Sequence, residues 1–379
     1  MVRYFNTEGC CRPDKHYMVR LDDRLDKIKN LYVDRGKYIV INKGRQYGKT
    51  TTLKALETFL ENDYIVFAMD FQMMSSSNFA DEHTFVVKFV EYMERLFSEM
   101  GEMIKDIDAD SFCDLLSLKD KENVTMDILF DRLSRICALS KKPTVLMIDE
   151  VDSASNNQVF IDFLAQLRGY YLNREKRSIF HSVILAGVYD IKNLKLKIRP
   201  DEEHQYNSPW NIAADFKIDM SFSTNQIAAM LAEYEADYNT GMNAAAVADE
   251  IYQYTSGYPY LISAICKYLD EEITDAWNKE GVTEAVKMLL IENIPLFGSM
   301  MRHISEYPNL KNMLYAMLFL GERVTYNPDN KTIEQSCMFG YTVNDHGSVR
   351  VANRIFETRL YNFFLSEEEL ESLMSKKAK

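Results

Sequence analysis

A glycine-rich segment near the start of the chain has the residue types of a loop that binds phosphate. Its sequence is Gly44-Arg45-Gln46-Tyr47-Gly48-Lys49-Thr50-Thr51. It follows the apolar run 38–41 and precedes a helical pattern of apolar residues over 53–60. In this setting backbone N–H groups can point at phosphate oxygens, Lys49 can reach the β- and γ-phosphates, and the Thr50 hydroxyl can ligate Mg²⁺.

The segment departs from the usual spacing G-x-x-x-x-G-K-[ST] at one position. That spacing would put a glycine at position 43, where this chain has Lys43, and the first glycine comes one place later at Gly44. Taken alone, the segment is therefore open to a second interpretation, a glycine-containing turn capped by a lysine.

Two acids follow a second apolar run about a hundred residues downstream. The run 144–148 ends in Asp149-Glu150, as expected of a buried parallel strand that delivers acids at its carboxyl end. In phosphoryl-transfer enzymes a first acid of this kind holds the metal and a following glutamate can polarise the attacking water. Asp149 and Glu150 suit these roles, although a buried strand ending in a solvated acidic turn would look the same. Asp152 could also reach the metal, or it could cap a helix beginning near Asn156.

The elements around these motifs alternate between strand and helix up to about residue 220. Apolar runs at 64–70 and 182–187 predict two further strands, and helical spacing of apolar residues recurs at 85–97, 128–136 and 159–167. Repeated strand-helix units require right-handed crossovers and predict an α/β fold with a doubly wound parallel sheet. Ligands of such sheets bind beyond the carboxyl ends of the strands, where both motifs lie.

Composition indicates a globular protein of a reducing compartment, which we expect to be the cytoplasm. The 379 residues, 47% of them hydrophobic, suffice for two or three domains. Six cysteines occur without a C-x-x-C pair, and no apolar leader or membrane-spanning stretch is found. The net charge of −13 argues against broad attraction to nucleic acid.

The chain after residue 199 changes character twice. The segment 199–222 is irregular and carries Trp210, which is typical of a functional or poorly ordered connection. Ser223 to Gln226 then cap a helical region. Within it Gly257 can end one helix and Pro259 can begin the next, so the sequence predicts a helix-turn-helix corner.

The final hundred residues predict a winged helix. An amphipathic helix over 310–318 precedes the hairpin 341–352, which has Gly347 at its bend, and a helical tail follows. Basic and acidic side chains are balanced between residues 301 and 365. This balance does not favour a surface that follows a phosphate backbone.

In its order of motifs, the chain resembles the bacterial AAA-like NTPases, a group close to the STAND ATPases. The segments 42–53 and 185–194 are similar to a subgroup found mainly in anaerobic bacteria, and the resemblance covers about residues 16–364. It implies that the turn Gly257-Tyr258-Pro259 contacts adenine and that the winged helix is a regulatory lid. Many relatives have a phosphate-sensing arginine where this chain has Tyr189. Relatives often continue into a restriction-endonuclease-like domain, and because this chain stops after the tail we expect no nuclease activity of its own.

Together these features predict an ATP-binding protein, a slow Mg²⁺-dependent ATPase that acts as a nucleotide switch for a protein effector. ATP is favoured over GTP because no N-K-x-D element follows the acidic run. The predicted domains are a P-loop NTPase domain over 1–222, a helical lid over 223–284 and a winged-helix domain with tail over 285–379. The alternative is a winged-helix regulator that binds nucleic acid, with a conformation set by nucleotide.

Overall fold

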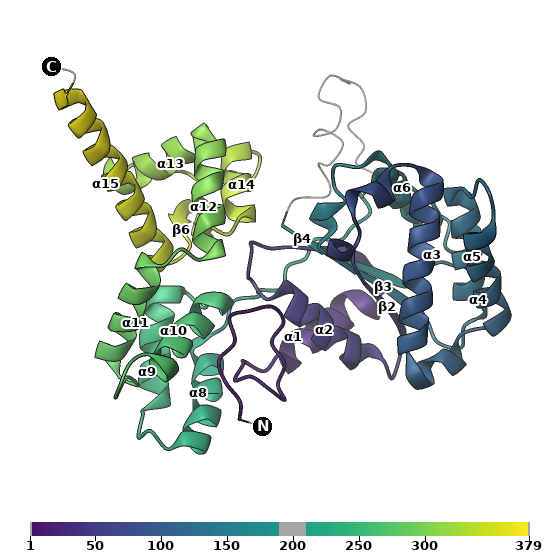
Figure 1. Ribbon diagram of the computed structural model, residues 1–379, viewed down its shortest axis with the longest axis horizontal. Helices are drawn as coiled ribbons and strands as arrows, with labels where there is room; N and C mark the ends of the chain where they lie inside the picture. The colour runs from purple at the N-terminus through teal and green to yellow at the C-terminus, as the bar shows by residue number, and fades with distance from the viewer. Residues whose placement is uncertain (1, 189–209, 378–379) are drawn as a thin grey trace. The chain divides into compact units, whose positions relative to one another are not determined.

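The computed structural model describes residues 2–188 and 210–377, without the side chains of residues 102–103 and 375–377. The chain divides into two compact units. The sheet unit consists of residues 21–42 and 49–218, and the helical unit consists of residues 1–20, 43–48 and 219–379. Figure 1 shows the elements of both units.

A parallel sheet forms the centre of the sheet unit. Within the described residues it has four strands in the order β1-β4-β3-β2. These are β1 (Tyr38–Asn42), β2 (Ile65–Asp70), β3 (Thr144–Asp149) and β4 (Ser182–Gly187). Both β3 and β4 are buried at every position, as expected when helices cover both faces of a parallel sheet. The prediction of a doubly wound parallel sheet is confirmed.

Helices cover the two faces of this sheet. One face presents Val40, Phe67, Leu146 and Leu185 to a large core. That core includes residues of three long helices, α3 (Glu82–Glu99), α5 (Met126–Leu139) and α6 (Gln158–Leu172), and of the shorter α4 (Ala109–Leu116). On the other face α2 (Lys49–Leu60) packs against β2, β3 and β4, and α1 (Asp22–Ile28) packs against α2 (Figure 1).

The described part of the irregular connection, residues 210–222, contributes to the edge of the sheet. Ala214 forms a single parallel bridge with Ile39, and its N–H donates to the carbonyl of Tyr38 at 2.8 Å. Trp210 is fully buried and stacks on the Tyr38 ring at 5.8 Å between centroids. The tryptophan of this segment therefore has a packing role beside β1.

Four helices follow in the helical unit: α8 (Thr224–Tyr238), α9 (Ala244–Thr255), α10 (Pro259–Glu271) and α11 (Lys279–Ile291). Ser223 and Gln226 form a capping box at the start of α8, as the sequence predicted. Gly257 has φ +80° between α9 and α10, and a Cβ there would lie 2.2 Å from the carbonyl oxygen of Phe222. Only glycine fits this corner, and Pro259 begins the next helix as predicted.

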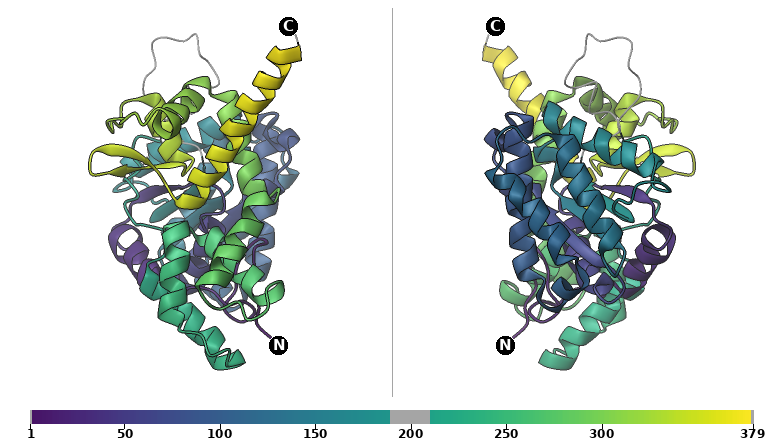
Figure 2. Two further views of the ribbon diagram at one scale, coloured as in Figure 1. Left: turned by 90° about the vertical axis from the view of Figure 1, so that its left-hand side faces the viewer. Right: turned by 90° about the vertical axis from the view of Figure 1, so that its right-hand side faces the viewer.

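The C-terminal part of the helical unit is a winged-helix region. Its elements are α12 (Pro295–Glu306), α13 (Pro308–Phe319), α14 (Lys331–Met338), β5 (Thr342–Asp345), β6 (Ser348–Val351) and α15 (Arg354–Lys377). His346 and Gly347 both have positive φ and form the predicted bend. A single antiparallel bridge that the sequence did not predict joins Thr325 to Ser348 of the hairpin. The last turns of α15 extend away from the other helices of this unit, with Leu370 and Leu373 exposed (Figures 1 and 2).

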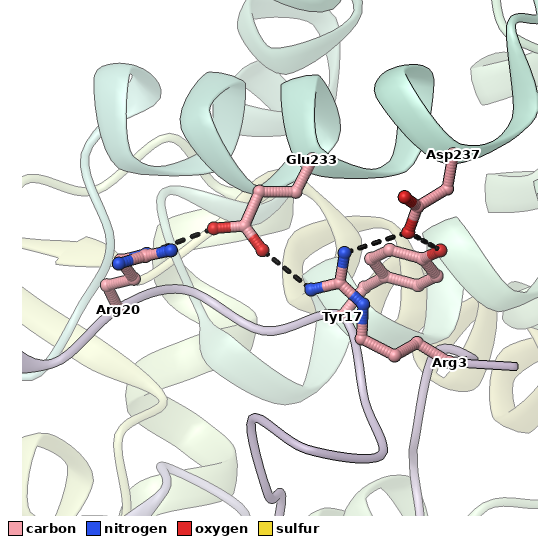
Figure 3. Close-up of polar contacts among 5 residues, drawn as sticks. All are labelled: Arg3, Tyr17, Arg20, Glu233 and Asp237. Atoms are coloured by element: carbon pink, nitrogen blue, oxygen red, sulfur yellow. Dashed lines mark hydrogen bonds and ion pairs between the residues drawn. The ribbon is translucent and has the colours of Figure 1, made fainter. Parts of the chain in front are cut away.

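The N-terminal residues 2–20, which we call the strap, pack against α8. The guanidinium of Arg3 lies 2.8 Å from a carboxylate oxygen of Glu233 and 2.8 Å from one of Asp237. The Tyr17 hydroxyl donates to Asp237 at 2.6 Å, and Arg20 pairs with Glu233 at 3.0 Å (Figure 3). Below these pairs, the ring of Tyr17 packs in an aromatic cluster with Phe5, Tyr234 and Trp277. The strap is thus part of the helical unit, although it precedes the sheet in sequence.

Candidate nucleotide site

The glycine-rich segment runs from the end of β1 at Asn42 to the start of α2 at Lys49. Gln46 and Gly48 have φ of 55° and 77°, so left-handed residues alternate with others in this loop. Such alternation turns successive N–H groups toward one side and makes an anion-binding concavity. Lys49, Thr50 and Thr51 form the first turn of α2, whose N-terminal end favours negative charge.

Lys43, which occupies the position of the usual glycine, is a partly buried side chain at the entrance of the loop. Burial lowers the pKa of its ammonium group, and the nearby negative charge of Asp219 works in the opposite direction. The departure from the usual spacing therefore places a cationic side chain, Lys43, beside the loop in addition to Lys49. The usual spacing would have a glycine at this position.

The two predicted motifs meet at the carboxyl edge of the sheet. The Thr50 hydroxyl donates to Oδ2 of Asp149 at 2.6 Å, although 99 positions separate the two residues in the sequence. Asp149 is only 6% exposed, and its Oδ1 accepts a hydrogen bond from the N–H of Glu150 at 2.9 Å. A hydroxyl and a carboxylate at this distance are oxygen donors of the kind that Mg²⁺ prefers.

These two donors fit a magnesium ion that arrives with a nucleotide. Mg²⁺ in such sites takes one or two protein ligands and completes its shell with water and phosphate oxygens. Across residues 2–188 and 210–377, no group of three His, Cys, Asp or Glu side chains forms a metal cluster. Thr50 and Asp149 supply two oxygen donors, within the number of protein ligands that such a site uses.

Glu150 adopts a conformation that is uncommon for a residue with a side chain. Its φ and ψ are 51° and 40°, in the left-handed region. The carbonyl of Glu150 accepts hydrogen bonds from the N–H of Ser153 at 3.1 Å and from its hydroxyl at 2.9 Å. The backbone after Asp149 is thus held in a sharp turn, and strained residues of this kind cluster at functional sites.

Asp152 has a role that the sequence did not indicate. Its Oδ2 accepts a hydrogen bond from the N–H of Val188 at 2.5 Å, just after β4. A Cβ on Gly187 would approach Oδ1 of Asp152 to 2.8 Å, so the glycine is required by this contact. The expectation that Asp152 caps a helix was wrong, because α6 begins at Gln158 and Asn157 is its N-cap residue. Tyr189, the next residue after this contact, lies outside the described residues.

Asp70 is a further acid that the sequence analysis did not assign to the site. It ends β2 and pairs in register with Asp149 at the end of β3. Burial raises the pKa of the Asp70 carboxyl, the hydrogen bond from the Gln72 N–H lowers it, and the charge of Asp149 raises it further. The signal was present, since both apolar runs end in aspartate and the carboxyl ends of parallel strands share one edge.

The loop residues 43–48 also contact the other parts of the helical unit. The Tyr258 hydroxyl donates to the carbonyl oxygen of Arg45, and the rings of Tyr258 and Tyr47 meet edge to face at 4.6 Å. A Cβ on Gly44 would lie 2.5 Å from the carbonyl oxygen of Phe339, after α14. The structure therefore brings the predicted loop residues Gly44–Gly48 together with the predicted corner Gly257–Pro259.

Comparison with solved structures identifies the fold. The Walker-type ATPase PABY2304 of Pyrococcus abyssi is similar over 94% of this chain and 99% of its own length, with a TM-score of 0.63 and 11% identity. The ORC2 protein of Aeropyrum pernix covers 96% of this chain and 98% of its own, with a TM-score of 0.48 and 12% identity. The first of these, over almost the full length of both chains, shows that this protein has the fold of a P-loop ATPase.

Comparison of the sequence with family models and with curated proteins finds no match. Among the described helices, none combines the length and apolar composition that crossing a membrane requires.

Proposed function

We propose that this protein binds ATP together with Mg²⁺ and hydrolyses it slowly, as a nucleotide-controlled switch for a protein effector. The observation that carries the proposal is the hydrogen bond between Thr50 and Asp149 at 2.6 Å. It joins the start of the helix after the glycine-rich loop to the acid at the end of β3. Two motifs that are each ambiguous alone support one site when they meet at the carboxyl edge of the sheet.

Each residue has a defined part in this proposal. Lys49 and the backbone N–H groups of residues 45–50 grip the phosphates, and Thr51 extends the first turn of the same helix. Thr50 and Asp149 hold Mg²⁺, which neutralises charge on the phosphate oxygens. Glu150 accepts a hydrogen bond from the attacking water and orients it for in-line attack.

In this proposal the helical unit regulates nucleotide binding and hydrolysis. Residues 223–284 act as a lid, with Gly257–Pro259 closing over the adenine base, and residues 285–379 act as a winged-helix regulator. The relationship to STAND-like ATPases of bacteria and the assignment to the cytoplasm belong to the same proposal. Support for the compartment comes from the six cysteines, all within the described residues, which are present as thiols and not as disulfides.

The decisive experiment is a calorimetric titration of the intact protein with ATP, with and without Mg²⁺. We expect saturable binding that is tighter with the metal, and slow release of inorganic phosphate in a turnover assay. GTP in place of ATP should bind more weakly. A protein that binds neither nucleotide at millimolar concentration would contradict the proposal.

A winged-helix regulator that binds nucleic acid is the second candidate, because Arg350 of β6 and Arg323, which donates to the Ser348 hydroxyl of β6, are exposed at the surface. Charge pairing works against it. Arg350 lies 3.2 Å from a carboxylate oxygen of Asp345, and Lys311 lies 2.9 Å from one of Glu367. We expect duplex DNA to bind no more tightly than about 10⁻⁵ M at physiological salt, the range of non-specific binding. A nanomolar, sequence-selective complex would favour this second candidate.

A further inference from the structure

Tyr258 occupies a position between the glycine-rich loop and the winged-helix region. Its hydroxyl donates to the carbonyl of Arg45 and its ring meets Tyr47. The ring also packs edge to face against Phe356 of α15, with centroids 5.3 Å apart. Only 2% of Tyr258 is exposed. The side chain is therefore held by residues of both regions and has little freedom to move independently of the loop.

The Tyr258 hydroxyl is a dependable donor. Burial, together with the neighbouring Tyr47 and Tyr341, raises the pKa of the phenol well above its ordinary value. The group therefore stays protonated across the working pH range. Loss of the hydroxyl would leave the carbonyl of Arg45 without this hydrogen bond and would destabilise the present loop conformation.

The hydrogen bond that holds the carbonyl of Arg45 also fixes the direction of the Gln46 N–H, because the two groups belong to one peptide. The described residues contain no cis peptide bond, and in a trans peptide the C=O and the following N–H point to opposite sides. The N–H of Gln46 is therefore directed away from Tyr258. Gln46 is one of the two left-handed residues of the loop, so its N–H belongs to the set that forms the anion-binding concavity.

We propose that Tyr258 is a positioning residue for the phosphates, which aims the Gln46 N–H by holding the Arg45 carbonyl. This inference rests on the proposed nucleotide binding and adds a named residue to it. Tyr258 acts through the loop backbone and need not touch the nucleotide. Since Phe356 packs against the ring, α15 of the winged-helix region influences how firmly the loop is held.

A second contact of the winged-helix region with the loop agrees with this coupling. The turn after α14 approaches so closely that a Cβ on Gly44 would lie 2.5 Å from the Phe339 carbonyl oxygen. The loop is thus held by the lid corner at Arg45 and Tyr47 and by the winged-helix region at Gly44. A shift of that region would loosen two of the supports of the phosphate site together.

The test uses Tyr258→Phe, which removes the hydroxyl and keeps the ring. We expect Tyr258→Phe to weaken ATP binding about 5-fold and to speed release of a fluorescent ADP analogue by a similar factor. In turnover, KM should rise while kcat changes little. The matched control is Tyr234→Phe, which removes a phenol hydrogen bond to Asp270 within the lid and leaves the loop contacts intact. The control should bind ATP like the wild type.

A double-mutant cycle with Phe356→Leu tests the role of α15. Phe356→Leu alone should weaken ATP binding. The loss of ATP affinity that it causes should be smaller in the Tyr258→Phe background, because both changes act through the same hydrogen bond. If the wild type binds ATP and Tyr258→Phe has the same ATP affinity and the same rate of ADP-analogue release, the inference is overturned. The proposed function would remain intact in that case. Equal losses in Tyr258→Phe and Tyr234→Phe would assign the effect to general lid stability and would also overturn it. Failure of the wild type to bind ATP would instead contradict the proposed function.

Discussion

The sheet unit and the helical unit hold their important residues by different means. In the sheet unit, Asp70, Asp149 and Gly187 end strands whose positions are set by backbone ladders and by burial on both faces. In the helical unit, the loop is held by a phenol, edge-to-face rings and close backbone contacts, and the strap is held by ion pairs. The sheet therefore fixes its residues through backbone ladders, whereas the loop and the strap of the helical unit depend on side-chain contacts that are weaker individually.

The largest expected effect concerns the start of α2 in the sheet unit. Lys49→Ala removes the cation proposed to meet the β- and γ-phosphates, so ATP affinity should fall about 100-fold or more. Calorimetry measures this directly. Lys54→Ala is the matched control, because Lys54 lies one turn further along the same helix and pairs with Glu57 at 3.2 Å. Tight ATP binding by the Lys49 variant would contradict the assignment of residues 44–51 as a phosphate-binding loop.

Glu150→Gln should separate binding from chemistry within the sheet unit. If Glu150 orients water while Asp149 holds the metal, the variant should bind ATP normally and turn over about 100-fold more slowly. Phosphate release gives the rate and calorimetry gives the affinity. Glu57→Gln, on the outer part of α2, should change neither quantity. An unchanged rate in the Glu150 variant would exclude this residue from the mechanism.

Gly44→Ala tests the close backbone contact in the helical unit. The added methyl would meet the Phe339 carbonyl at 2.5 Å, so the turn after α14 must move away. Such overpacking typically costs 1–3 kcal/mol, and we expect the melting temperature to fall by about 5 °C. Gly298→Ala in α12 is the control and should not be destabilised, because among the described residues the added group would meet no atom within 4 Å beyond its chain neighbours and its own helix backbone. Equal melting temperatures for the two variants would show that the contact is not tight.

The smallest effect is expected for the strap. Arg3→Ala removes both ion pairs to α8 and should lower the melting temperature by about 2–4 °C at pH 7. Hydrogen bonds from Tyr17 and Arg3 hold the pKa of Asp237 below its usual value. A group with a depressed pKa in the folded state stabilises the protein above its unfolded pKa, and this contribution is lost as the pH falls through the folded value.

The difference between wild type and Arg3→Ala should therefore shrink as the pH falls below about 4, the ordinary pKa of aspartate. Differential scanning calorimetry at several pH values measures it. The exposed pair Arg12–Asp14 offers the control, since Arg12→Ala should change the melting temperature by less than about 1 °C. A difference that stays constant down to pH 3 would show that the ion pairs do not contribute as the structure indicates.

The sequence by itself determined the elements that local patterns encode. Apolar runs predicted the four described strands of the parallel sheet, because a strand buried on both faces is mostly apolar. The corner at Gly257 and Pro259 and the bend at His346 and Gly347 followed from backbone preferences that glycine and proline impose on their own. The glycine-rich loop and Asp149 were predicted as a site for the same reason, since their residue types and order restrict the chemistry.

Only the tertiary structure decided which distant groups meet. No local pattern showed that Asp152 bonds the N–H of Val188 or that Thr325 bridges Ser348 of the hairpin. The assignment of the strap to α8 and the contacts of Tyr258 and Phe339 with the loop were equally invisible. These contacts join residues far apart in sequence. An aspartate or a tyrosine can form its hydrogen bonds with many different partners, and a glycine can fit many different close contacts. Which way is used depends on how the strands and helices pack, and that packing is set by the whole chain at once.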